Sequence, residues 1–115
     1  MNISIKNNQK EFFPGDEIAG FVEVTPQEVE GEIQANLLYG TQGLGVQDIV
    51  SVAVENLTLR GDKAKFYFLL PSAPWSCRGS YLSLSWFIEV SHRSIKEPVK
   101  YTFTLSDTGK VKDIS

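Results

Sequence analysis

Apolar and polar residues alternate along most of the chain with a period of two, the pattern of half-buried β-strands. The segment 31–40, "GEIQANLLYG", shows it plainly: Ile33, Ala35, Leu37 and Tyr39 share one face of an extended backbone. The polar residues between them occupy the opposite face, since successive side chains of a strand point to opposite sides. We therefore predict a strand here with one buried face.

The same alternation recurs in six other segments, so seven strands are predicted. They span residues 3–5, 17–25, 31–40, 48–57, 63–71, 81–90 and 99–105. Outside the segment just described, the side chains expected to face the core are Val50, Val52, Val54, Ala64, Phe66, Phe68, Leu70, Leu82, Leu84, Trp86, Ile88, Val90, Val99, Tyr101, Phe103 and Leu105. Helix is nearly absent; a single turn is conceivable within 26–34, where Gly31 interrupts it.

Turn-forming residues separate the predicted strands and support this division. Turns are expected at Pro14-Gly15-Asp16, at Arg60-Gly61-Asp62 and in the segments 40–45, 71–79 and 91–94. Pro71 ends its strand because proline has no backbone N–H to give to a sheet. Short strands with one apolar face predict two antiparallel sheets packed face to face. The expected architecture is an all-β sandwich, one domain covering residues 1–115.

Two motifs resemble those of the arrestin-like family. "FFPGDEIAGFVEV", residues 12–24, resembles the family's Pro-Gly-Asp turn and the strand with an internal glycine that follows. "FYFLLPSAPWSCRGSYLSLSWFIEV", residues 66–90, resembles its phenylalanine-rich strand, proline-containing loop and aromatic strand. The matching positions are Pro14, Gly15, Asp16, Gly20, Phe66, Phe68, Leu70, Pro71, Pro74, Ser76, Gly79 and Trp86.

This resemblance implies an immunoglobulin-like sandwich of the kind found in arrestins, the retromer cargo-binding subunit and bacterial sporulation-control proteins. Those proteins are adaptors and scaffolds without catalytic activity. The chain departs from arrestins in having one sandwich rather than two. Nothing in it matches their polar core or phosphate-sensing basic cluster, so receptor and phosphopeptide binding are not carried over.

Composition and charge narrow the function further. The formal charge of −3 and the pI near 5.1 disfavour a nucleic-acid partner, which usually requires a basic surface. No apolar run reaches the length of a membrane span, and the first residues lack the apolar segment of a signal peptide. Cys77 is the single cysteine, so no internal disulfide forms, and a lone thiol fits a reducing compartment. A cytoplasmic location is therefore expected.

Candidate chemistry is sparse, and we predict no catalytic residue, no cofactor and no metal site. His92 is the single histidine and is expected to be a solvated turn residue. One histidine and one cysteine cannot build a structural zinc site. Cys77 stands beside Arg78, and because a neighbouring cation can activate a thiol, an enzyme or redox sensor built on Cys77 is an alternative interpretation. Arg60-Gly61-Asp62 is expected to be an ordinary hairpin turn rather than an adhesion motif.

Apolar residues at expected surface positions are the main functional signal. Leu38 and Phe87 fall on outward faces and Trp75 on a loop tip, so they either form an exposed apolar patch or are covered by neighbouring chain. We predict a non-enzymatic protein-interaction module that binds a partner protein through a sheet face or an edge strand, with Trp75, Arg78 and Phe87 as contact residues. Homodimerisation through an edge strand is the related assembly, and a secreted adhesin or carbohydrate-binding module is the alternative.

Overall fold

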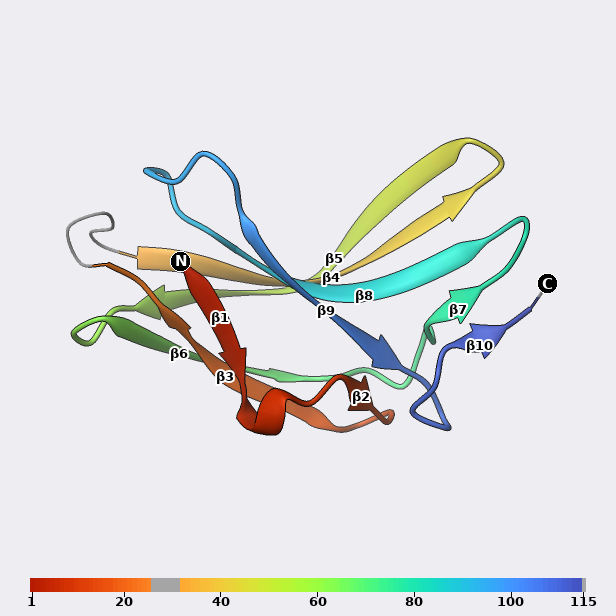
Figure 1. Ribbon diagram of the computed structural model, residues 1–115, viewed down its shortest axis with the longest axis horizontal. Helices are drawn as coiled ribbons and strands as arrows, with labels where there is room; N and C mark the ends of the chain where they lie inside the picture. The colour runs from red at the N-terminus through yellow and green to blue at the C-terminus, as the bar shows by residue number, and fades with distance from the viewer. Residues whose placement is uncertain (26–31, 115) are drawn as a thin grey trace.

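A computed structural model describes residues 1–25 and 32–114 (Figure 1). Over these residues the chain forms ten strands and one short 3₁₀ turn. The elements are β1 (Asn2–Ile5), η1 (Lys6–Asn8), β2 (Glu11–Phe12), β3 (Glu17–Glu23), β4 (Glu32–Gly43), β5 (Val46–Thr58), β6 (Lys63–Leu69), β7 (Cys77–Arg78), β8 (Ser83–Ser91), β9 (Val99–Leu105) and β10 (Lys112–Asp113). All seven predicted strands are present; most of the 26–34 segment lies outside the described residues.

The strands make two sheets. β3 pairs antiparallel with β1 on one side and β6 on the other. In the larger sheet β4 lies between β5 and β8 (Figure 1). Beyond β8, the short strands β7 and β10 continue this sheet near one end, while β9 and β2 continue it at the other. The β2–β9 and β7–β10 pairs are parallel, and every other pair is antiparallel as predicted.

The core lies between the sheets and is built from the alternating faces. Trp86 and Ile88 of β8, Ile18 of β3 and Leu37 of β4 are fully buried. Phe12 and Phe103 meet edge to face with ring centroids 5.3 Å apart, a geometry that aromatic pairs favour. The predicted all-β sandwich is confirmed, and the strand carrying Trp86 runs through its centre.

Four side chains that were predicted to be buried in the core are exposed instead. Val50, Val52 and Val54 are 40%, 42% and 53% exposed, and Leu82 is 44% exposed. In β5 it is Ala53 that lies opposite the buried Leu37, so Val54 faces outward beside Asn36. A register shift opposite Leu37 and Leu38 inserts Val52 as an extra residue, a β-bulge that changes the alternation. Leu82 lies just before β8 begins.

The two family-like motifs mark turns and close approaches. The Asp16 backbone N–H donates to the Phe13 carbonyl at 3.0 Å, and the Asp16 carboxylate accepts the Phe13 N–H at 2.8 Å. Gly15 has φ +83°, the left-handed conformation that a type II turn requires at its third residue. In β3, a Cβ on Gly20 would lie 2.1 Å from the Ser4 carbonyl oxygen of β1. Glycine is therefore needed where β1 pairs with β3.

The loop between β6 and β8 fixes the central tryptophan. The Trp86 indole N–H donates to the Pro74 carbonyl at 2.8 Å, so the buried ring keeps its polar atom satisfied. Tyr39 packs on the same ring with centroids 5.1 Å apart. The loop itself is anchored by the Ser76 N–H, which donates to the Leu105 carbonyl at 2.7 Å. These contacts explain why prolines and a tryptophan separate two strands here.

Tyr101 of β9 provides a titratable contact with the segment before β2. Its hydroxyl donates to the Gln9 carbonyl at 2.6 Å, and partial burial raises its pKa above the ordinary value of 10.0. A pKa raised by folding contributes stability below the unfolded pKa and loses it as pH rises through the folded pKa. We therefore expect Tyr101→Phe to flatten the loss of unfolding free energy above pH 10. Urea denaturation at several alkaline pH values tests this; identical slopes for variant and parent would contradict it.

Candidate interaction surfaces

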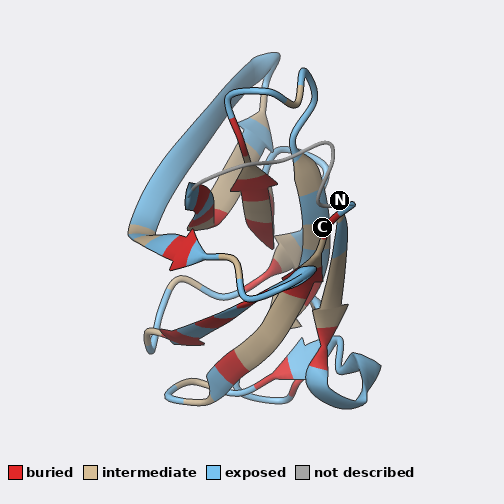
Figure 2. Ribbon diagram, turned by 90° about the vertical axis from the view of Figure 1, so that its left-hand side faces the viewer, coloured by how far each residue is buried: buried red, intermediate tan, exposed pale blue. Residues whose placement is uncertain are grey.

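The most exposed apolar surface of the fold lies on β5, an edge strand. Among the described residues β5 pairs only with β4, so no strand is hydrogen-bonded along its second backbone edge, and β6 lies near the C-terminal end of β5. Figure 2 shows β5 exposed over most of its length. Its exposed apolar side chains are Val46, Ile49, Val50, Val52 and Val54. An edge strand of this length and composition is a template for pairing with another chain.

The β4–β5 hairpin extends beyond the smaller sheet, which explains the exposure of both its faces. In Figure 1 its tip projects past the strands β1, β3 and β6. Val50 pairs with Tyr39 on the core-facing side, yet no strand of the other sheet covers it at that distance along the hairpin. Only Asp48 is charged between Val46 and Val54. Proline and lysine, which commonly discourage edge pairing, are absent from this stretch.

Leu38 and Phe87 were expected either to form an exposed apolar patch or to be covered by neighbouring chain. They do not form an exposed patch. They are cross-strand partners on the outer face of β4 and β8, and both are buried, with 7% and 8% exposure. The Lys100 ammonium of β9 lies 5.1 Å from the Phe87 ring centroid and is also paired with Glu89 at 3.9 Å. Coverage by neighbouring chain is therefore the correct alternative, and Phe87 offers little surface for a partner.

Trp75 and Arg78 belong to the segment between β6 and β8, and Arg78 lies across β8 and β4 from β5. Trp75 is 39% exposed, its indole N–H donates to the Ser72 carbonyl at 2.7 Å, and the Lys112 ammonium lies 5.5 Å from its ring centroid. Arg78 is in β7, three residues along the same loop. Trp75 and Arg78 are therefore both exposed, whereas Phe87 is buried beside Lys100 on the outer face of β8.

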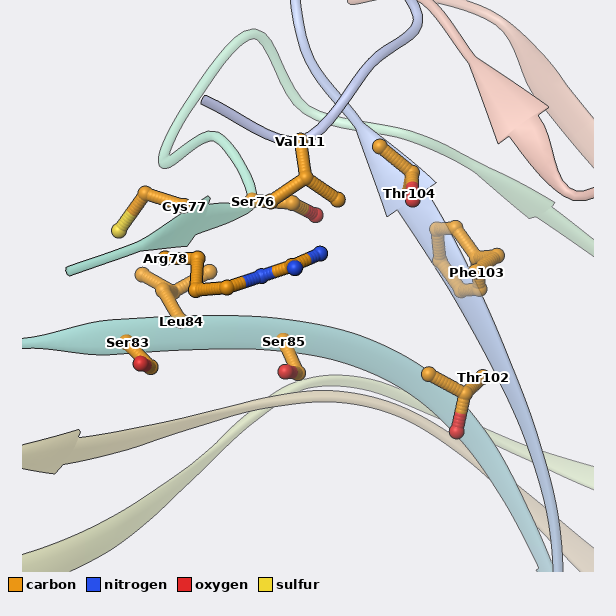
Figure 3. A pocket seen from close by; sticks show the side chains of 10 residues that line it. All are labelled: Ser76, Cys77, Arg78, Ser83, Leu84, Ser85, Thr102, Phe103, Thr104 and Val111. Carbon is orange, nitrogen blue, oxygen red and sulfur yellow. The ribbon is translucent and has the colours of Figure 1, made fainter. Parts of the chain in front are cut away.

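Arg78 lines a cleft of about 220 Å³ between β7, β8 and β9 (Figure 3). The cleft exists because β8 changes partner: Leu84 pairs with Cys77 of β7, whereas from Trp86 onward β8 pairs with β9. The lining residues are Ser76, Cys77, Arg78, Ser83, Leu84, Ser85, Thr102, Phe103, Thr104 and Val111. Five of them carry a hydroxyl group. Sequence reasoning selected Arg78 but gave no sign of this hydroxyl-lined cleft.

A second hollow of about 540 Å³ lies between the end of β5 and β6. Arg60, Lys63, Lys65 and Glu55 supply its charged lining. The Tyr67 N–H on the free edge of β6 donates to the Glu55 carboxylate at 3.4 Å. Glu55 therefore already engages one backbone group on that edge, next to the place where the two sheets separate.

The remaining candidate residues have structural surroundings. His92 is buried rather than solvated, which corrects the prediction; its Nδ1 accepts the Ser94 backbone N–H at 3.0 Å and so is already engaged within the turn. Arg60-Gly61-Asp62 is the predicted hairpin turn: the Arg60 N–H donates to the Lys63 carbonyl at 2.7 Å, and Gly61 has φ +70°. Cys77 is a free, half-buried thiol on the wall of the Arg78 cleft.

Residues 1–25 and 32–114 contain neither a cluster of metal-binding side chains nor a membrane-spanning helix. No three or more His, Cys, Asp or Glu side chains in these ranges are grouped to hold a metal ion. No helix in the same ranges is long and apolar enough to cross a bilayer.

Comparison with known proteins supports the fold alone. No protein-family model matches the sequence, and no curated protein matches it. Among solved structures, the fold is similar to that of Spo0M, a sporulation control protein from Bacillus subtilis, with a TM-score of 0.64 and 13% identity. The match covers 91% of this chain and 48% of the Spo0M chain, so the chain spans about half the length of that neighbour.

The class of fold is therefore an arrestin-like β-sandwich, as the two motifs predicted. Spo0M, one solved structure that it resembles, is a sporulation control protein. At 13% identity this likeness concerns backbone architecture alone.

Proposed function

We propose that this chain is a non-enzymatic protein-interaction module that captures an extended segment of a partner protein along β5. The observation that carries the proposal is the exposed edge of this 13-residue strand. The proposal treats residues 1–115 as one interaction domain working in the cytoplasm, in an adaptor or scaffold role.

Strand addition fits the chemistry of β5. A guest strand would satisfy the backbone N–H and C=O groups along the unpaired edge, which supplies affinity without regard to sequence. Selectivity would come from alternate side chains, since Val52, Val54 and Ile49 present apolar surface that a guest of matching pattern would bury. An apolar guest loses less on leaving water than a charged one, so it is favoured.

Two assemblies use this surface. In one, the guest strand belongs to a different protein; in the other, β5 of a second copy pairs antiparallel across a two-fold axis. Asp48 and Glu55 are the only charged residues of β5, and both are acidic. Self-pairing gains no attraction from these charges, so we favour a different protein as partner.

The double variant Val52→Lys/Val54→Lys tests the proposal. Both side chains are more than 40% exposed, so unfolding free energy should change by less than about 0.5 kcal/mol. Lysines on an edge strand oppose strand addition because their charge is desolvated when a guest docks. In pull-downs from lysate of the native cell, we expect the variant to lose the proteins that the parent chain retains.

Leu69→Lys is the matched control, because Leu69 is an exposed apolar residue of a strand in the other sheet. It should retain every partner. If the β5 double variant retains them too, capture along β5 is wrong. Sedimentation of the purified parent chain separates the two assemblies: a concentration-dependent dimer abolished by the double variant would identify a second copy as the guest.

A further inference from the structure

We propose that the Arg78 cleft is a binding site for a single carboxylate group presented by an acidic peptide. This site lies apart from the edge described above: β8 and β4 stand between the cleft and β5. The proposal therefore does not depend on strand addition, and its experiment does not involve β5.

The electrostatics of the cleft favour an anion. Arg78 is the only charged residue among the ten that line it. No ion pair between residues of the ranges 1–25 and 32–114 uses its guanidinium. Figure 3 shows the Arg78 side chain extended along β8, between that strand and Val111, with its guanidinium toward β9. A local cation in a protein of charge −3 is a selective feature rather than part of a broad basic surface.

Hydroxyl groups line the cleft together with Arg78. Ser85, Thr102 and Thr104 lie on the outer faces of β8 and β9, where each can rotate its O–H toward a ligand. The Ser76 hydroxyl oxygen accepts the Leu105 N–H at 3.0 Å, which leaves its own hydrogen to donate. The guanidinium fork of Arg78 matches the two oxygens of a carboxylate, and the hydroxyl groups of the lining are further donors within the same cleft.

The net charge of the residues around the cleft favours a carboxylate over a phosphate group as the ligand. The adjoining hollow shares Arg78 and Val111 with the cleft and adds Lys112 and Asp113. Lys112 is ion-paired with Asp107, and Asp113 is the neighbour of Arg78 in the β7–β10 register. The Asp113 carboxylate beside Arg78 reduces the net positive charge of the two hollows, which disfavours a doubly charged phosphate more than a singly charged carboxylate.

The volume of the cleft favours a ligand that is a side chain or a chain end of a peptide. A volume of about 220 Å³ holds a carboxylate with a short aliphatic stem. Leu84, Phe103 and Val111 provide apolar contact for such a stem. The ligand class is therefore an aspartate, glutamate or terminal carboxylate on an otherwise uncharged peptide segment.

Nuclear magnetic resonance of the ¹⁵N-labelled chain tests the site with two matched peptides, acetyl-Gly-Asp-Gly-amide and acetyl-Gly-Asn-Gly-amide. The aspartyl peptide should shift the Arg78 side-chain Nε–H and the backbone signals of Ser85 and Thr102 in a saturable titration. The asparaginyl peptide should not shift these signals, because its side chain has nearly the same shape as that of aspartate but carries no charge. Acetate should shift the same signals more weakly, which distinguishes a bare anion from a peptide-borne carboxylate.

Arg78→Gln should weaken the aspartyl peptide about tenfold or more, as expected for loss of a charge-assisted hydrogen-bonded pair. Arg93→Gln is the control; it removes the same charge from an exposed turn and should leave binding unchanged. Three results would overturn the site: no saturable shifts with the aspartyl peptide, equal affinity for both peptides, or equal losses in the two variants. Tighter binding of inorganic phosphate at equal ionic strength would overturn the assignment to a carboxylate.

Discussion

Trp86→Ala should reduce the free energy of unfolding by about 3–5 kcal/mol, the range for removing a fully buried tryptophan from a packed core. The ring has 0% exposure, and it contacts both Tyr39 and Phe103. The substitution also leaves the Pro74 carbonyl without the indole N–H that it accepts. Because typical domains have only about 5–15 kcal/mol of stability, the effect should be among the largest for any single residue.

Urea denaturation followed by far-ultraviolet circular dichroism measures this loss. Trp75→Ala is the control, since Trp75 is 39% exposed and lies outside the core; it should cost less than about 1 kcal/mol. If Trp86→Ala fails to fold, Trp86→Phe provides a graded test, because it keeps an aromatic ring and removes the indole N–H. Equal stability of the Trp86 and Trp75 variants would refute the central position of Trp86.

Gly20→Ala should cost about 3 kcal/mol, at the upper end for a methyl group forced into occupied space. The new Cβ would lie 2.1 Å from the Ser4 carbonyl oxygen and 3.1 Å from the Ile5 Cα. Both atoms belong to the backbone of β1 and cannot rotate away as a flexible side chain would. β1 must therefore separate from β3, which also exposes the buried Ile5.

Gly40→Ala is the matched control because Gly40 also lies within a strand and the nearest atoms to its added Cβ are 3.7 Å away. Its cost should stay below about 1 kcal/mol. Hydrogen exchange on the Gly20 variant should show faster exchange across β1 than in the parent chain. Slow exchange in β1 together with unchanged stability would show that β1 does not approach β3 as closely as described.

The alternating pattern predicted the strands well where both sheets cover the chain. β6 and β8 each place the expected residues inward, because neighbouring strands lie on both sides of β8 and the opposite sheet covers both strands. In β5 the alternation did not predict which side chains are buried. Alternation looks the same in a strand over the core and in one that extends beyond it, and the bulge at Val52 has no signature in the sequence.

The short strands β2, β7 and β10 were missed for a different reason. Two residues are too few to show a period, and each strand exists only because a distant segment offers a partner. The Arg78 cleft has the same origin: it follows from the change of partner along β8, which is a tertiary property. Likewise, alternation correctly placed Phe87 on the outer face but could not show Lys100 of the neighbouring strand covering it.

The different surroundings of the two tryptophans give the molecule two separate spectroscopic reporters. Trp75 is 39% exposed and its ring centroid lies 5.5 Å from the ammonium of Lys112, whereas Trp86 is sealed between the sheets. A water-borne collisional quencher of fluorescence therefore reaches one indole and not the other while the chain is folded. Emission from the accessible indole reports on the surroundings of Lys112, and the protected emission reports on the integrity of the interior.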